Sequence, residues 1–251
     1  MNNLQETLLF PVRDAEARKQ FLIACLVMLA AFIIPILPTL VLLGYGTKIM
    51  RQIVDERKSP SMPSWQGSDW SEMLLDGVRL YGAQLVLMLP LLLIMGCGFI
   101  FMIGGSVGMT ALADESSRSF APIGGLFLFI GIAMMMIFSL LSLPYGVILS
   151  AVGPHVATKH SFAAGFEFKE WWPIFRKAIG QFILSYAITM VVSFIFVFVI
   201  QIAMITLILM CIVPFIMIPY SVYVMLMTNT LYAQAYLTGR DSLQSAEYTS
   251  A

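Results

Sequence analysis

A few ionisable side chains flank the long apolar runs of this sequence, and they could supply acid–base chemistry. The candidates are Asp69, Glu72, Asp76 and His160. A carboxylate and an imidazole held together could act as general base and general acid in an enzyme that acts on lipids. No two of these residues have the spacing of a recognisable catalytic pair, so the sequence predicts no catalytic residues and no enzyme.

Metal binding and nucleophilic catalysis are the next chemistries to consider. His155 and His160 lie five residues apart, which is not the i, i+4 spacing of paired ligands on a helix, and no Asp, Glu or Cys accompanies them closely. The cysteines Cys25, Cys97 and Cys211 each lie inside an apolar run, far from one another. A Walker loop and a zinc-protease motif are absent from the sequence. We therefore expect no metal, no cofactor and no disulfide framework.

Polar side chains inside the apolar runs could instead line a path for a solute. No Asp, Glu, Lys or Arg lies deep in these runs, which argues against proton-coupled transport, voltage sensing and aspartyl intramembrane proteolysis. Amides and hydroxyls in such positions commonly form hydrogen bonds between helices. The candidates for a polar path are Asn229, Gln84 and Gln201, and Asn229, flanked by Thr228 and Thr230, is the first of them.

The composition indicates the medium in which these residues lie. Of 251 residues, 59% are hydrophobic and 11% are charged, whereas a soluble domain has about 25% charged residues. The 14 Lys and Arg balance the 14 Asp and Glu, so there is no cationic surface to bind nucleic acid, and we expect no such partner. The sequence therefore predicts an all-α integral membrane protein whose main partner is the lipid bilayer.

Four stretches without any Asp, Glu, Lys or Arg contain the expected membrane helices. They are residues 20–47, 80–113, 119–158 and 178–239. One helical crossing needs about 20 residues, so the last stretch is too long for a single helix. We expect it to turn at Cys211–Pro214, between helices at 180–208 and 215–237.

The two middle stretches supply one helix each, at 80–104 and 122–150, separated by the glycine-rich, acidic segment 104–120. The first stretch is ambiguous. Pro35 and Pro38 lie in its middle and could either kink one helix or turn a hairpin. Its length does not decide between the two.

The distribution of positive charge favours the hairpin, because Lys and Arg prefer short cytoplasmic loops. With a hairpin there are six segments, and thirteen of the 14 Lys and Arg lie on one side; with five segments the division is ten against four. We therefore predict about six transmembrane or re-entrant helices, with five as the alternative, in the cell membrane. The predicted parts are a cytoplasmic segment 1–19, a single helical membrane domain 20–238 and a short cytoplasmic tail 239–251.

The two loops that this topology places in the cytoplasm carry all four tryptophans. These are Trp65, Trp70, Trp171 and Trp172. In the first loop, Asp69 and Glu72 resemble a capping box that starts a helix; in the second, aromatic residues recur every three to four positions over 162–179. Both loops are predicted to be amphipathic cytoplasmic segments in the membrane interface, where tryptophan can contact lipid or a partner. The alternative is that they pack on neighbouring helices.

Several short motifs follow one another in an order typical of a known family. They are Phe10-Pro11-Val12-Arg13-Asp14, Gly44-Tyr45 before Lys48 and Arg51, Pro63-x-Trp65, Leu75-Asp76-Gly77, the segment Ser161–Phe168 and the segment Leu231–Tyr236. Over about residues 8–238 the sequence resembles a prokaryotic family of polytopic membrane proteins known only as a domain of unknown function. Ala233 stands where the family leads us to expect a glycine, and Ser64 where an acidic residue is common. The resemblance implies an all-helical membrane protein and supplies no catalytic residue, cofactor or substrate.

The sequence thus predicts a non-enzymatic scaffold or accessory subunit of a membrane complex. Its partners would be other membrane subunits or a second copy of the chain. This interpretation depends on the lack of charge in the apolar runs and on the two aromatic loops. The alternative is a transporter or channel for a small neutral or amphipathic solute, including lipid, which the proline-broken helices and the polar residues within them would suit.

Overall fold

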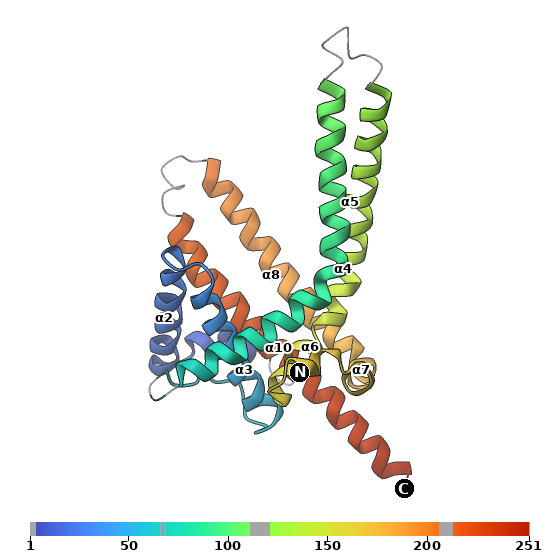
Figure 1. Ribbon diagram of the computed structural model, residues 1–251. Helices are drawn as coiled ribbons and strands as arrows, with labels where there is room; N and C mark the ends of the chain where they lie inside the picture. The colour runs from blue at the N-terminus through green and yellow to red at the C-terminus, as the bar shows by residue number, and fades with distance from the viewer. Residues whose placement is uncertain (1–3, 66, 68, 111–120, 206–212, 251) are drawn as a thin grey trace. The chain divides into compact units, whose positions relative to one another are not determined.

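The computed structural model describes residues 4–65, 67, 69–110, 121–205 and 213–250 (Figure 1). These residues form helices and turns, without a strand among them, which confirms the all-α class. Four helices are long and apolar enough to cross a membrane. They are Trp70–Thr110, Pro122–Lys159, Ile179–Met204 and Phe215–Ala246.

The N-terminal region consists of short helices that proline and aspartate residues delimit. They are α1 (Leu4–Leu9), η1 (Phe10–Val12), α2 (Ala15–Leu29), η2 (Ala30–Phe32) and α3 (Leu37–Val54). Asp14 caps α2, since its Oδ1 accepts a hydrogen bond from the Ala17 N–H at 2.7 Å. Pro38 lies in the first turn of α3, where its missing N–H costs no hydrogen bond. Residues 20–47 therefore form two helices rather than one, while six membrane crossings remain a prediction.

Helices α4 (Trp70–Thr110) and α5 (Ala121–Leu149) are joined by residues outside the described part of the chain. The bounds of α5 agree with the predicted helix at 122–150. Helix α4, however, continues to Thr110, so the predicted end of this helix at Gly104 is wrong. The glycines that suggested an end are positions where the two helices pack closely. A Cβ on Gly105 would lie 2.4 Å from the backbone nitrogen of Leu128, and one on Gly108 would lie 2.7 Å from the Cα of Gly124.

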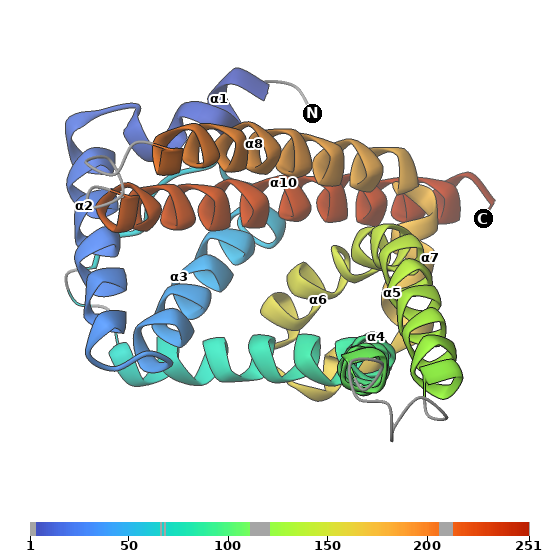
Figure 2. The same ribbon diagram turned by 90° about the horizontal axis from the view of Figure 1, so that it is seen from above.

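The described residues after α5 form three short helices followed by two long ones. They are α6 (Val152–Lys159), η5 (Ala163–Phe166), α7 (Phe168–Lys177), α8 (Ile179–Ile205) and α10 (Val213–Ser250). The fold-back of the last apolar stretch is confirmed, since α8 lies beside α10 (Figure 2). Of the predicted turn at 211–214, residues 211 and 212 lie outside the described residues, and Val213 begins α10. Helix α10 continues through the predicted tail from residue 239 onwards.

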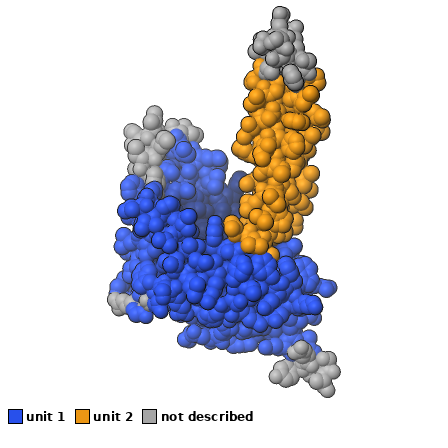
Figure 3. Space-filling view, viewed as in Figure 1, with its two compact units in different colours: residues 1–84, 147–251 blue, residues 85–146 orange. Residues whose placement is uncertain are grey.

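The chain divides into two compact units (Figure 3). Unit 2, residues 85–146, is the hairpin of α4 and α5. Unit 1, residues 1–84 and 147–251, has α10 at its centre, against which α2, α3, α6, α7 and α8 pack. Its largest fully buried side chains include Trp171, Tyr45 and Phe182. Most ionisable groups of the protein belong to unit 1, and the candidate site is built there.

Candidate functional site

Two glycines position the first polar group of unit 1, where α3 crosses the start of α4. A Cβ on Gly44 would lie 1.7 Å from the carbonyl oxygen of Met73, and one on Gly77 would lie 1.8 Å from that of Leu40. Neither position can carry a side chain, because the two backbones touch there. Asp76, next to Gly77, is thereby held inside the crossing at 3% exposure.

The loop before α4 folds back over this crossing. The Trp65 ring stacks on Tyr45, with the ring centroids 4.3 Å apart and the planes 2° from parallel. The Tyr45 hydroxyl donates to the carbonyl of Pro63 at 2.7 Å, and Trp65 Nε1 donates to the carbonyl of Gln20 at 3.0 Å. The motifs Gly44-Tyr45, Pro63-x-Trp65 and Leu75-Asp76-Gly77 thus meet in one junction. Their shared role is to fix α2, α3 and α4 together.

Asp76 is the centre of an ion-pair network. Its carboxylate accepts hydrogen bonds from the guanidinium of Arg51 and from Nη1 of Arg79, the latter at 3.1 Å. Arg51 Nε also donates to the carbonyl of Ala157 at 2.8 Å, which ties α3 to α6. A buried carboxylate between two guanidinium groups has its charge compensated. We call Arg51, Asp76 and Arg79 the Asp76 network.

The structure brings three of the four predicted acid–base residues together. Ligand atoms of Glu72, Asp76 and His160 lie within 4.8 Å of one another. Asp69 has a different role: its Oδ1 accepts hydrogen bonds from the backbone N–H groups of Ser71 at 2.9 Å and Glu72 at 3.3 Å, so it caps α4 as predicted. The hydrogen bond from the Ser71 hydroxyl, followed by these two N–H groups, holds the pKa of Asp69 below its ordinary value.

A second polar group, which we call the His155 cluster, gathers at α6, α7 and α10. His155 is 2% exposed, and its Nδ1 lies 2.7 Å from the Tyr236 hydroxyl. Its Nε2 is buried without a hydrogen-bond partner, 3.6 Å from Oε2 of Glu167 and 3.8 Å from Oε2 of Glu170. Lys159 Nζ lies 2.7 Å from the same Glu170 oxygen, and its hydrogen bond lowers the pKa of Glu170. The cluster therefore gathers groups from α6, the start of α7 and α10 around one buried imidazole.

No acidic residue accompanies the two histidines closely in the sequence, but the fold brings carboxylates to both of them. Each histidine faces two carboxylates, in the groups Glu72, Asp76, His160 and His155, Glu167, Glu170. The missed signal is local: Glu167 and Glu170 lie i, i+3 at the start of α7, a spacing that puts both side chains on one face. Tyr236 lies 81 positions from His155, and no sequence spacing could have indicated that contact.

The family described as "Protein of unknown function (DUF4013)" matches residues 27–209. The chain belongs to this family. Among curated proteins and among solved structures, none matches. The match includes the junction of α3 and α4, the Asp76 network and both carboxylates of the His155 cluster, whereas Phe10–Asp14 and Leu231–Tyr236 lie outside it.

The four tryptophans of this DUF4013 protein divide into two buried and two exposed rings. Trp65 is 5% exposed, and Trp171 is 1% exposed with its Nε1 donating to the carbonyl of Gly165 at 3.2 Å. Trp70 and Trp172 are 49% and 40% exposed. Trp65 and Trp171 therefore pack on neighbouring helices, which agrees with the alternative interpretation of the two loops. Of the four rings, only those of Trp70 and Trp172 are exposed.

The predicted polar-path residues lie on three different helices. Asn229 on α10 is buried against α3, where a Cβ on Gly46 would lie 2.0 Å from Asn229 Nδ2. Gln84 is half-buried on α4 and Gln201 is exposed on α8. In the described part of the chain, no hydrogen bond connects any two of them. The missing side chain of Gly46 makes room for Asn229, whose Nδ2 is buried without a hydrogen-bond partner.

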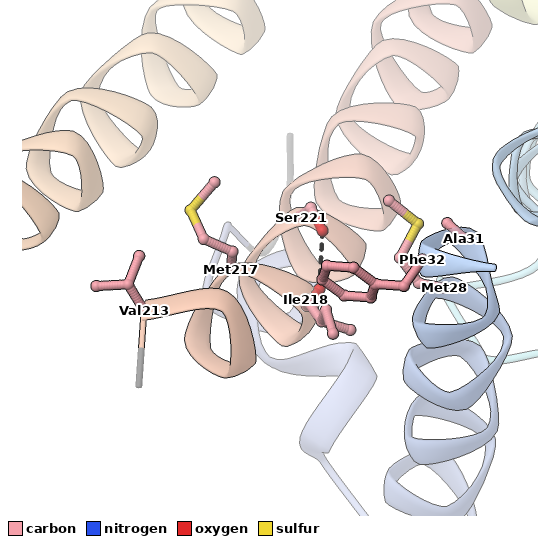
Figure 4. Close-up of a pocket in the computed structure, with 7 residues that line it drawn as sticks. All are labelled: Met28, Ala31, Phe32, Val213, Met217, Ile218 and Ser221. Atoms are coloured by element: carbon pink, nitrogen blue, oxygen red, sulfur yellow. Dashed lines mark hydrogen bonds between the residues drawn. The ribbon is translucent and has the colours of Figure 1, made fainter. Parts of the chain in front are cut away.

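Unit 1 also contains an apolar pocket between α2 and the start of α10 (Figure 4). Its volume is about 440 Å³, and its lining is Met28, Ala31, Phe32, Val213, Met217, Ile218 and Ser221. The hydroxyl of Ser221 donates to the carbonyl of Ile218 within the helix, at 2.9 Å. A pocket of this chemistry suits a hydrocarbon chain.

Proposed function

We propose that this DUF4013 protein is a non-enzymatic, multi-pass membrane protein that acts as a scaffold or accessory subunit of a membrane complex. One observation carries the proposal. Three of the long helices each contain an 18-residue window of high hydropathy, and little of that window is buried inside the chain. The buried share is 11% in α4, 6% in residues 122–159 and 6% in residues 179–204. Helix faces so little covered by their own chain must contact lipid or the helices of other subunits.

The outward side chains of these helices are large and apolar. Phe129, Leu140 and Phe194 are 70%, 74% and 74% exposed. Bulky rings and branched chains of this kind can interdigitate with those of a partner helix, since packing drives association within a bilayer. The buried carboxylate of Asp76, by contrast, is occupied by two arginines, which supports a structural role for that network rather than a catalytic one.

For the topology we propose six membrane segments with both termini in the cytoplasm, α2 and α3 being a short hairpin. Thirteen of the 14 Lys and Arg residues then lie on the cytoplasmic side. Helix α7 would lie in the inner interface, with Trp171 and Phe175 buried and with Phe168 and Trp172 exposed. Reporter fusions after residues 35 and 112 should read as external and one after 251 as cytoplasmic; a cytoplasmic reading at 35 would contradict the hairpin.

Site-specific photo-crosslinking in native membranes tests the proposed role. A photoreactive amino acid at Phe194 or Leu140, both 74% exposed, should give one discrete protein adduct of reproducible mass. The matched control places the same probe at Phe182, which is fully buried, and should give none. Lipid adducts alone at both exposed positions would contradict a role as a subunit.

The pocket favours a second candidate function, the binding or transport of an amphipathic solute or lipid. A Met217→Trp substitution would fill the pocket, whereas Met190→Trp on the exposed side of α8 would leave it open. If this function holds, liposomes containing the first variant should lose lipid or solute flux that the second retains. Absence of flux from the wild-type protein would remove transport as a candidate function.

A further inference from the structure

The unpaired imidazole nitrogen of His155 points to a ligand that the residue contacts alone do not supply. A buried ring nitrogen without a hydrogen bond is costly, because it loses its water without gaining a partner. Here the other ring nitrogen, Nδ1, lies 2.7 Å from the Tyr236 hydroxyl, so the ring orientation is set. Nε2 is directed at two carboxylate oxygens that lie just beyond hydrogen-bonding distance.

The spacing of these three atoms fits a shared metal ion. Ligands about 2.1 Å from a tetrahedral Zn²⁺ lie about 3.4 Å from one another. Nε2 of His155 lies 3.6 Å from the Glu167 oxygen and 3.8 Å from the Glu170 oxygen, and all three ligand atoms lie within 4.8 Å of one another. A small inward movement of the two half-exposed glutamates would bring them to ligand distance.

Charge distinguishes the His155 cluster from the other group with the same residue types. Glu72 and Asp76 face the two guanidinium groups of Arg51 and Arg79, so that group has no net charge to attract a cation. In the His155 cluster, Glu167 and Glu170 face one ammonium group, that of Lys159. With a neutral imidazole the cluster keeps one net negative charge, which favours a cation.

We infer that His155, Glu167 and Glu170 form a binding site for a divalent transition-metal cation such as Zn²⁺, which would connect α6 to the first turn of α7. An imidazole ligand favours Zn²⁺, Fe²⁺ or Ni²⁺ over Mg²⁺ and Ca²⁺, which prefer oxygen ligands. Tyr236 of α10 holds the ring through Nδ1, in the way that an outer hydrogen bond orients a metal-binding histidine. Lys159 competes with the metal for Glu170.

The inference goes beyond the proposed scaffold role, and it assigns the metal a structural task. Helix α7 carries the exposed Trp172 and the basic residues Arg176 and Lys177. A metal between His155 and the glutamates of α7 would fix this helix against the bundle. Metal binding would then reduce the motion of α7 relative to the helices against which it packs.

Zinc titration of the purified full-length protein in detergent, after removal of bound metal with a chelator, tests the site. One Zn²⁺ should bind per chain with micromolar or tighter affinity, and millimolar Mg²⁺ should not displace it. Glu167→Gln and Glu170→Gln should each weaken binding at least tenfold, because each removes an anionic ligand from a half-exposed position that the fold tolerates. Lys159→Gln should tighten binding severalfold.

Glu72→Gln is the matched control, since it removes a carboxylate from the other group, and it should leave Zn²⁺ affinity unchanged. Co²⁺ provides a second measurement: its visible absorption should appear in the wild-type protein and be lost in Glu167→Gln/Glu170→Gln. Equal affinities of the wild-type and doubly substituted proteins for Zn²⁺, or binding only at millimolar concentration, would overturn the inference. Neither result would bear on the crosslinking test of the scaffold role.

Discussion

Units 1 and 2 are stabilised in different ways. Unit 1 buries aromatic rings, paired charges and hydrogen bonds between segments far apart in the sequence. Unit 2 has no charged residue in 85–110 or 121–146, and its two helices pack through glycines, which leaves their large side chains directed outwards. Unit 1 therefore contains most of the contacts that stabilise it, whereas the outward side chains of unit 2 depend on contacts with its surroundings.

The largest effect is expected in the Asp76 network. Asp76→Asn leaves Arg51, whose side chain is 15% exposed, without its buried anionic partner and with only the exposed carboxylate of Glu72 at 3.8 Å. Removing one partner of a buried ion pair costs about 3–5 kcal/mol, so the free energy of unfolding in detergent should fall by that amount. Arg79→Gln, at a partner that is 32% exposed, is the control and should cost much less. Equal losses would show that burial does not set the strength of this network.

The tryptophans of the first loop give the next contrast. Trp65→Ala removes the ring stacked on Tyr45 and the hydrogen bond to Gln20, and it should cost about 3 kcal/mol of unfolding free energy. Trp70→Ala, at a ring that is 49% exposed, should cost less than about 1 kcal/mol. Thermal unfolding of the two variants in the same detergent decides the matter. A greater loss of unfolding free energy in Trp70→Ala than in Trp65→Ala would contradict the packing of Trp65 on Tyr45.

For unit 2 we expect a smaller loss of stability. Gly105→Leu places a side chain where a Cβ already lies 2.4 Å from the backbone of Leu128, so the hairpin must separate, at about 1–3 kcal/mol. Leu140→Ala, at an outward position that is 74% exposed, should change unfolding by less than about 0.5 kcal/mol. Cysteine crosslinking across the hairpin would report the separation. An unchanged crosslink in Gly105→Leu would contradict the glycine packing.

The contrast between the units also explains what the sequence could predict. The bounds of α5 and the fold-back of α8 on α10 followed from long apolar stretches without charge, because such stretches can only be helices in a membrane. The Asp69 cap followed from its local spacing. The Arg51–Ala157 and His155–Tyr236 contacts, 106 and 81 positions apart, depend on how helices cross, and helical periodicity indicates only which face a residue occupies.

The smallest expected effect concerns pH and the start of α4. Hydrogen bonds hold the pKa of Asp69 below its ordinary value, so its ionised form stabilises the helix above about pH 3.9. This stabilisation is lost as the pH falls through the lowered pKa of the folded state. Hydrogen exchange at the amides of Ser71 and Glu72 should therefore show less protection at low pH, apart from the intrinsic pH dependence of exchange. Asp69→Asn, which caps without titrating, should show no such extra loss.

The native mass of the protein extracted in a mild detergent tests most directly whether its exposed helix faces bind other subunits. We expect a discrete assembly, with a second copy or another membrane protein at fixed stoichiometry, which Phe194→Ala/Phe198→Ala weakens without unfolding unit 1. A single chain of 27.9 kDa carrying only lipid, with the same mass in the wild-type protein and the variant, would contradict it.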